Sequence, residues 1–231
     1  MRPAIGLLFC ALLAAPLPGQ IPTSAAEFAG LARYSDENAK LPATERGRVV
    51  FMGNSITEGW APLFAKLFPG KPYVGRGISG QTTAQMLPRF RQDVITLHPA
   101  VVVILAGTND IAGNTGSAAL EEIRDNIASM ADLARANGIH VVLCSVLPVY
   151  DYPWKPGLEP AAKIMTLNTW LKAYADAHDA VYVDLHAAMR DNRNGLKSEY
   201  TYDGVHLSEA GYRLMSTLVG QGIAAALNAR R

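Results

Sequence analysis

Short apolar runs alternate with longer amphipathic stretches along most of the chain. The first run is 48–52, and a helical pattern follows it over 56–68. The same order recurs with apolar runs at 73–74, 101–106, 140–147 and 181–184, and with helical patterns at 82–97, 117–137, 161–178 and from Ser208. Such alternation predicts a parallel sheet with helices on both faces. We therefore expect one α/β domain over residues 27–231.

The first residues have a different pattern. Met1 and Arg2 precede an apolar run of about 14 residues, which is shorter than the roughly 20 needed to span a bilayer. Small residues at 24–26 follow, as in a secretory signal. We expect residues 1–26 to be a signal peptide and the mature protein to be exported to the periplasm or the medium. Cleavage near Ala26 removes Cys10 and leaves Cys144 as the single cysteine, so no disulfide is expected.

Composition narrows the class of partner. The chain has 231 residues, of which 49% are hydrophobic and 18% are charged, and its formal net charge is +1. It lacks clusters of Lys and Arg, which argues against a nucleic-acid partner, and no later segment is apolar enough for a membrane span. We expect a small or neutral ligand. The pattern does not define an oligomeric state.

The stretch GRGISGQTT places glycines at 75, 77 and 80 in a G-x-G-x-x-G spacing. A dinucleotide site would need this motif after the first strand, with an acidic residue about 20 positions further on. Here the motif follows the second strand, we expect Arg76 to occupy the turn, and Asp110 lies 35 residues beyond Gly75. The alternative is a loop that offers backbone donors to an anion.

Polar residues follow the first strand and recur near the C-terminus. Ser55 stands where a strand turns into a helix, which suits a nucleophile but also an ordinary helix cap. Asp203 and His206 are three residues apart across an Asp-Gly turn, a spacing that lets the carboxylate reach the imidazole and hold it as a base. An Asp-Gly turn beside a helix start is the structural alternative. None of the other four histidines stands in a metal-ligand pattern.

A nucleophilic serine also needs donors for the developing oxyanion. The candidates are the N–H groups of Ser55 and Gly80 and the side-chain amide of Asn109. They follow the first three strands, and they converge if the strand order is 2-1-3-4-5. We therefore interpret the glycine stretch as part of an oxyanion hole.

Taken together, four ordered blocks resemble the SGNH hydrolase superfamily, also called GDSL esterases and lipases. They are Gly53-Asn54-Ser55, Gly80, Gly107-Thr108-Asn109-Asp110 and Asp203-Gly204-Val205-His206. The resemblance implies a flavodoxin-like three-layer fold, a triad of Ser55, Asp203 and His206, and no metal or organic cofactor. The chain is similar to the branch with platelet-activating-factor acetylhydrolase-like and bacterial carbohydrate acetylesterases. Asn54 replaces the commoner aspartate of the first block.

Substrate contacts are expected in the proline-rich loop after the fourth strand. Trp154 and Tyr152 there could stack on a sugar ring or simply pack the loop onto the sheet, and Asn54 beside the nucleophile is a third candidate contact. No long apolar insertion provides a lid, which favours short acyl chains. We expect a serine esterase that removes acetyl groups from a carbohydrate. The alternatives are a lysophospholipase or thioesterase, and a non-catalytic carbohydrate-binding protein of the same fold.

Overall fold

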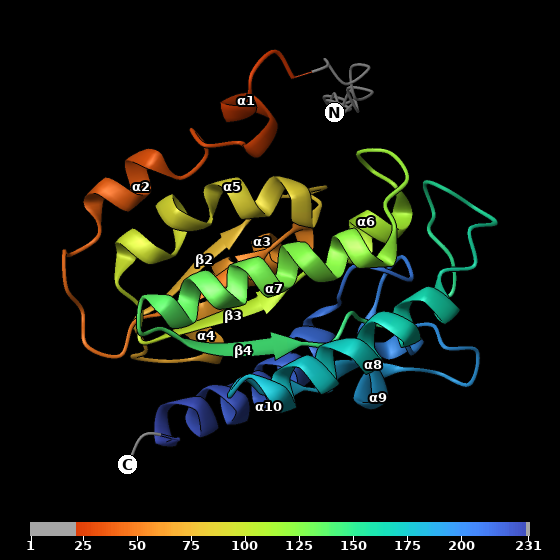
Figure 1. Cartoon of the computed structure of the whole chain (residues 1–231). Coiled ribbons are helices and arrows are strands. Elements are labelled where there is room, and N and C mark those ends of the chain that lie inside the picture. The colour runs from red at the N-terminus through yellow and green to blue at the C-terminus, as the bar shows by residue number, and fades with distance from the viewer. Residues whose placement is uncertain (1–21, 230–231) are drawn as a thin grey trace, which may run out of the picture.

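The computed structural model describes residues 22–229 and has a five-stranded parallel sheet at its centre (Figure 1). The strands are β1 (Val49–Gly53), β2 (Tyr73–Gly77), β3 (Val101–Leu105), β4 (His140–Cys144) and β5 (Val181–Val183). Their order is β2-β1-β3-β4-β5, and every neighbouring pair is parallel. Both the predicted sheet and its predicted order are confirmed.

Helices connect the strands. They are α1 (Ala25–Ala29), α2 (Ser35–Lys40), α3 (Ser55–Trp60), α4 (Phe64–Leu67), α5 (Thr83–Asp93), α6 (Thr108–Ala112), α7 (Leu120–Ala136), α8 (Ala161–Ala177), α9 (Leu185–Met189) and α10 (Glu209–Asn228). The helix expected over 56–68 is instead broken by a 3₁₀ turn at Ala61–Leu63, where Pro62 lacks the N–H that a continuous helix needs. The expected start of the last helix is confirmed, since Ser208 caps α10 through its side chain.

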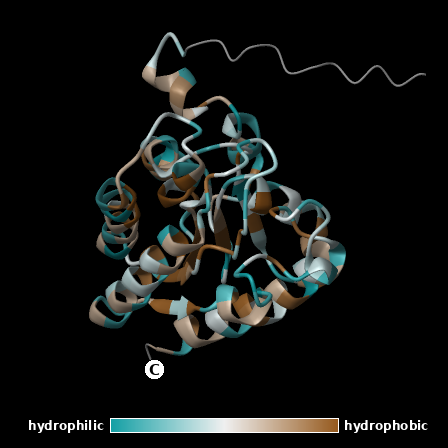
Figure 2. Cartoon of the chain, turned by 90° about the vertical axis from the view of Figure 1, so that its right-hand side faces the viewer, coloured by the Kyte–Doolittle hydropathy of each residue, from teal (hydrophilic) through white to brown (hydrophobic). Residues whose placement is uncertain are grey.

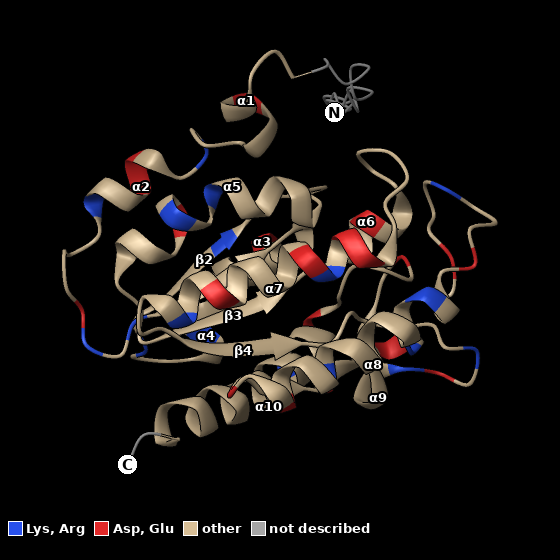
Figure 3. Ribbon diagram, in the orientation of Figure 1, with Lys and Arg blue, Asp and Glu red and all other residues tan. Residues whose placement is uncertain are grey.

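The strands are buried on both faces, which completes the three-layer arrangement. Val50 and Met52 of β1 face the core formed with α5, α7 and α8, whereas Val49 and Phe51 face the core formed with α3, α4, α9 and α10. Figure 2 shows the hydrophobic residues gathered on the central strands and on the helix sides near them. Charged residues of both signs are interspersed over the outer surfaces of the helices in Figure 3.

The glycine stretch differs from the expectation. Gly75, Arg76 and Gly77 belong to β2, so Arg76 is not in a turn; it is buried inside the fold. A Cβ on Gly75 would lie 2.4 Å from the Cβ of Ala61, and one on Gly77 would lie 2.2 Å from the Glu58 nitrogen. These two glycines are therefore required for the close approach of the segment 55–61 to β2. Only the residues after Gly77 form a loop.

The strand register aligns the loops that carry the candidate site. Gly53 at the end of β1 pairs with Gly77 of β2 and with Leu105 of β3. The carboxyl ends of the three strands are thus level, and the segments that follow them begin side by side. In open parallel sheets this edge is where ligands bind.

The amino-terminal region adds two helices, α1 and α2, which are not among the helices that the sequence pattern predicts. Of the predicted signal segment 1–26, residues 1–21 lie outside the described residues, and the expected cleavage position near Ala26 falls in α1. At the other end, α10 leads from the candidate site to the edge where the strands begin, so Ala229 lines a cavity with His140 and Val181. Between residues 22 and 229, no helix combines the length and apolar character that a bilayer span requires.

Candidate active site

Ser55 is the first residue of α3, two positions after β1 ends. The N–H groups of the first helical turn have no acceptor within the helix, so the Ser55 N–H is free to serve a ligand. Its side chain is half-buried and lies at the carboxyl edge of the sheet. This position matches the one expected for a nucleophile.

Asp203 and His206 face each other across the predicted turn. The Nδ1 of His206 lies 2.7 Å from Oδ2 of Asp203, while Oδ1 of Asp203 accepts from the N–H groups of Val205 (2.9 Å) and His206 (2.7 Å). Burial alone would raise the pKa of Asp203, but these hydrogen bonds from His206 and Val205 outweigh it and the net shift is downward. The carboxylate is therefore anionic at neutral pH, and it fixes the tautomer in which Nδ1 carries the proton.

The other imidazole nitrogen points to the serine. His206 Nε2 lies 3.1 Å from Ser55 Oγ, although the two residues are 151 positions apart in the chain. With Nδ1 donating to Asp203, Nε2 is the lone-pair nitrogen and accepts from the hydroxyl. The arrangement can move a proton from Ser55 Oγ to His206 as the oxygen attacks an electrophile.

The loop after β2 is tightly held and leaves one backbone donor available. The N–H groups of Ile78, Ser79 and Gln81 donate to Gly53 O (3.2 Å), Glu58 Oε2 (2.9 Å) and Ile78 O (3.2 Å). Gly80 has a left-handed backbone (φ 78°) and is exposed, which leaves its N–H for a ligand among the described groups of this loop.

Asn109 is buried at the start of α6, in the segment after β3. Its amide nitrogen donates one hydrogen to Gln81 O at 2.9 Å, which ties it to the loop of Gly80, and the second amide hydrogen can donate elsewhere. Next to it, burial raises the pKa of Asp110, while hydrogen bonds from the Thr83 hydroxyl and N–H act in the opposite direction. The three candidate donor groups thus come from adjacent, interconnected loops.

The three residues predicted to contact the substrate differ in their exposure to solvent. Trp154 is exposed, as a contact residue should be, whereas Tyr152 is only 1% exposed and its hydroxyl is bonded to Thr108 at 2.9 Å. Burial also raises the pKa of Tyr152 to about 12. Asn54 is 1% exposed, and its Oδ1 is buried. Both side chains are closed off from the surface, so Trp154 is the exposed one of the three predicted contacts.

Sequence reasoning missed Tyr202, which is 72% exposed. Its ring stacks against the His206 imidazole at a centroid distance of 6.0 Å and an interplanar angle of 13°, and the Trp154 ring lies 6.1 Å from the same imidazole. Two aromatic rings therefore lie close to the imidazole. The sequence feature that could have identified Tyr202 is its position directly before Asp203 in the predicted turn.

Other reactive groups are less suited to catalysis. The thiol of Cys144 is buried in β4, and burial raises its pKa to about 12, so it stays protonated and shielded. Within residues 22–229 no group of three or more His, Cys, Asp or Glu side chains is placed to hold a metal ion.

The fold and the linked serine, histidine and aspartate are typical of hydrolases with an activated serine. The chain belongs to the GDSL-like lipase/acylhydrolase family, whose family model matches residues 51–214. This confirms the resemblance that the four sequence blocks indicated.

Comparisons with individual proteins agree with this assignment. The chain is 48% identical to a GDSL-like lipase from Bacteroides thetaiotaomicron, with a TM-score of 0.83 over 86% of this chain and 99% of that one. An acetylxylan esterase from Geobacillus stearothermophilus shares the fold at 18% identity, with a TM-score of 0.63 over 83% and 100% of the two chains. Esterase TesA of Pseudomonas aeruginosa is 36% identical over 99 residues, which are 41% of this chain and 48% of TesA. The matched segment thus spans about half the length of this curated relative.

Proposed function

We propose that the protein is a serine esterase that hydrolyses short-chain esters through an acyl-enzyme on Ser55. The observation that carries this proposal is a pair of linked hydrogen bonds: His206 Nδ1 donates to Asp203 (2.7 Å), and the Ser55 hydroxyl donates to His206 Nε2 (3.1 Å). A hydroxyl at a helix start is often only a cap, but here Asn54 occupies the cap position of α3, and the Ser55 hydroxyl is bonded to a base.

The reaction has two steps. Ser55 Oγ attacks the ester carbonyl carbon while His206 Nε2 takes the hydroxyl proton, and the carbonyl electron pair moves onto its oxygen. The N–H groups of Ser55 and Gly80 and the Asn109 amide stabilise that oxyanion. Collapse of this tetrahedral intermediate expels the alcohol oxygen, which receives the proton from His206, and leaves the acyl group on Ser55. Water then attacks the acyl-enzyme with His206 again as base, which releases the acid and regenerates the serine.

The acceptor side of the substrate is proposed to be a carbohydrate, with acetyl as the acyl group. Trp154 and Tyr202 present exposed rings near the imidazole that protonates the leaving alcohol. A sugar ring is amphipathic enough to lie against such aromatic faces. In the same proposal the protein acts after export, following removal of residues 1–26.

Labelling with a serine-directed phosphonate tests the proposal. We expect one adduct, mapped by mass spectrometry to Ser55, and faster turnover of p-nitrophenyl acetate than of octanoate or longer esters, because the site has no extended apolar insertion. Faster turnover of long acyl chains or acyl thioesters would favour the lysophospholipase or thioesterase alternative. A folded sample with neither adduct nor turnover would indicate a binding protein.

Trp154→Ala and Tyr202→Ala should each raise KM for an acetylated oligosaccharide by about 2- to 10-fold, since an aromatic contact is worth about 0.5–1.5 kcal/mol. The kcat for p-nitrophenyl acetate, which lacks the sugar, should stay within about twofold of wild type. Tyr150→Ala is the control, because Tyr150 is exposed in the same loop but carries Arg193 over its ring. Equal KM changes for both substrates would contradict a sugar-binding role.

A further inference from the structure

A segment before residue 51, where the family match begins, is hydrogen-bonded to the loop between β2 and α5, residues 78–82, which we call the glycine loop. We call residues 28–38 the strap; it runs from the end of α1 into the first turn of α2 and lies along α5 (Figure 1). Three glutamine side chains donate to its carbonyl oxygens: Gln81 to Ala29 (2.9 Å), Gln85 to Phe28 (3.0 Å) and Gln92 to Leu31. The strap is therefore held by specific polar contacts in addition to packing.

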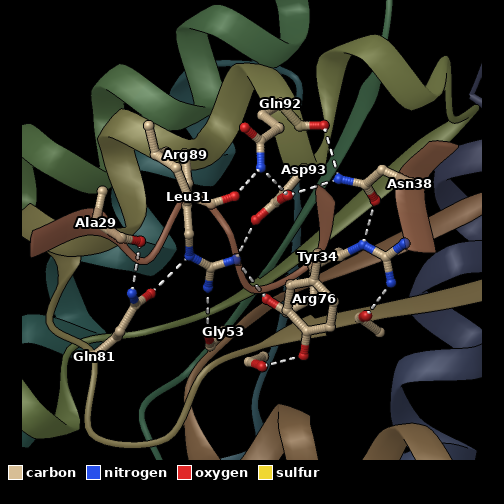
Figure 4. A network of polar contacts seen from close by, with 12 residues as sticks. Ala29, Leu31, Tyr34, Asn38, Gly53, Arg76, Gln81, Arg89, Gln92 and Asp93 are labelled. Atoms are coloured by element: carbon tan, nitrogen blue, oxygen red, sulfur yellow. Dashed lines mark hydrogen bonds and ion pairs between the residues drawn. The ribbon is translucent and has the colours of Figure 1, made fainter. Parts of the chain in front are cut away.

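Arg89 links the strap contact of Gln81 to the interior of the sheet (Figure 4). Its Nε donates to Gln81 Oε1 (2.7 Å), its Nη2 to Gly53 O (3.0 Å), and its Nη1 to Arg76 O (3.0 Å) and Asp93 Oδ2 (2.9 Å). Arg89 and Asp93 are both fully buried. The guanidinium thus joins the ends of β1 and β2 to the loop through one rigid, planar group.

The strap reaches the other side of the same loop through two more side chains. The Tyr34 hydroxyl donates to Gly77 O at the end of β2, and Arg33 donates to Glu58 at 3.2 Å. Glu58 in turn accepts from the Ser79 N–H and hydroxyl. The residues around Gly80 are thus held from the strap both before and after the glycine.

We infer that the strap is part of the catalytic apparatus and that Gln81 and Tyr34 are positioning residues for the oxyanion hole. The inference rests on the proposed function, because it assigns the Gly80 N–H and Asn109 to that hole. Gln81 is central because its side chain joins Arg89 and the strap, while its backbone carbonyl accepts from the Asn109 amide. One residue thus fixes both donors relative to Ser55.

This contact network has a chemical reason to be rigid. Oxyanion donors lower the barrier only when they are already aimed at the developing charge, and a misplacement of about 1 Å can cost about 100-fold in rate. Loops at a sheet edge are otherwise among the more mobile parts of a protein. Buried hydrogen bonds to a guanidinium and to a docked segment remove that mobility.

Gln81→Met tests the inference, because methionine keeps the length of the side chain but loses both of its hydrogen bonds. We expect kcat to fall by about 10- to 100-fold with KM within about twofold, and the rate of phosphonate labelling of Ser55 to fall by the same factor as kcat. Ser216→Ala is the control: it deprives the buried Trp60 Nε1 of its acceptor on the other face of the sheet and should leave kcat unchanged.

Tyr34→Phe is a second, conservative variant, made on the strap itself. It tests the inference alone if Gln81→Met does not fold. Loss of its hydroxyl should lower kcat about 3- to 10-fold at constant KM. Wild-type kcat in the folded variants would overturn the inference. So would a decrease in kcat that Ser216→Ala reproduces when it lowers Tm by the same amount. A fully active Ser55→Ala would instead refute the proposed function, so the two failures are distinguishable.

Discussion

Ser55→Ala should lower kcat for p-nitrophenyl acetate by about 10⁶-fold, the loss seen when the nucleophile of a serine triad is removed. The folded structure should not suffer, because Asn54 and not Ser55 occupies the cap position of α3, and alanine is a good helix former. Binding of an acetylated oligosaccharide should persist, since Trp154 and Tyr202 are unchanged.

The matched control is Ser129→Ala, which removes a half-buried serine from α7, a helix that contributes no residue to the candidate site or to the strap. It should retain wild-type kcat. Thermal unfolding of both variants shows whether the fold is intact. If Ser55→Ala keeps a tenth or more of the wild-type activity, Ser55 is not the nucleophile and the proposed mechanism fails.

Asp203→Asn should lower kcat by about 10⁴-fold with little change in the free energy of unfolding. The asparagine Oδ1 can still accept from the N–H groups of Val205 and His206, so the turn survives. Its Nδ2 donates, however, and so favours the tautomer in which His206 Nε2 carries the proton. Ser55 then has no base.

Asp191→Asn is the control for this change. Asp191 Oδ1 also accepts two backbone N–H groups in a turn, those of Arg193 and Gly195, but its Oδ2 lies 3.6 Å from the Arg193 side chain and not beside an imidazole as in Asp203. This variant should keep wild-type kcat. Equal losses in both variants would show that the turn, and not orientation of the imidazole, accounts for the effect.

The lowered pKa of Asp203 also determines how the pH profile should be interpreted. Because its folded pKa lies below the ordinary value, Asp203 contributes stability above that ordinary value and loses the contribution as pH falls through the lower, folded one. The carboxylate therefore stays charged between pH 5 and 8. Protonation of Asp203 should therefore lower kcat/KM only below the ordinary pKa of an aspartate, and a loss of kcat/KM traced to Asp203 between pH 5 and 8 would contradict the lowered pKa.

Much of the fold could be predicted because local patterns agree with the tertiary structure. The apolar runs of β1 and β3 are buried on both faces, as their continuous hydrophobicity indicates. The proximity of Ser55 and His206 could also be predicted, because the topology of a parallel sheet brings the loops at its carboxyl edge together. Their assignment to catalysis remains a prediction.

The features that were missed depend on contacts between distant residues. Gly75 and Gly77 have the sequence character of a loop, and their place in β2 is explained only by the approach of α3 and the turn after it. The sequence pattern did not single out the strap, because the hydrogen bond from Gln81 to Ala29 joins residues 52 positions apart. Tyr152 and Trp154 share a loop pattern, and only packing shows that the first is buried and the second exposed.

The direction of α10 suggests how the protein could be mounted on a solid support. The helix begins three residues after His206 and spans 20 residues, about 30 Å at 1.5 Å per residue. Its last residues lie by the edge where the strands begin, opposite Ser55. Attachment through this end would turn the candidate active site outward, where a bulky polymer can reach it. Attachment next to the strap would place the support against the glycine loop.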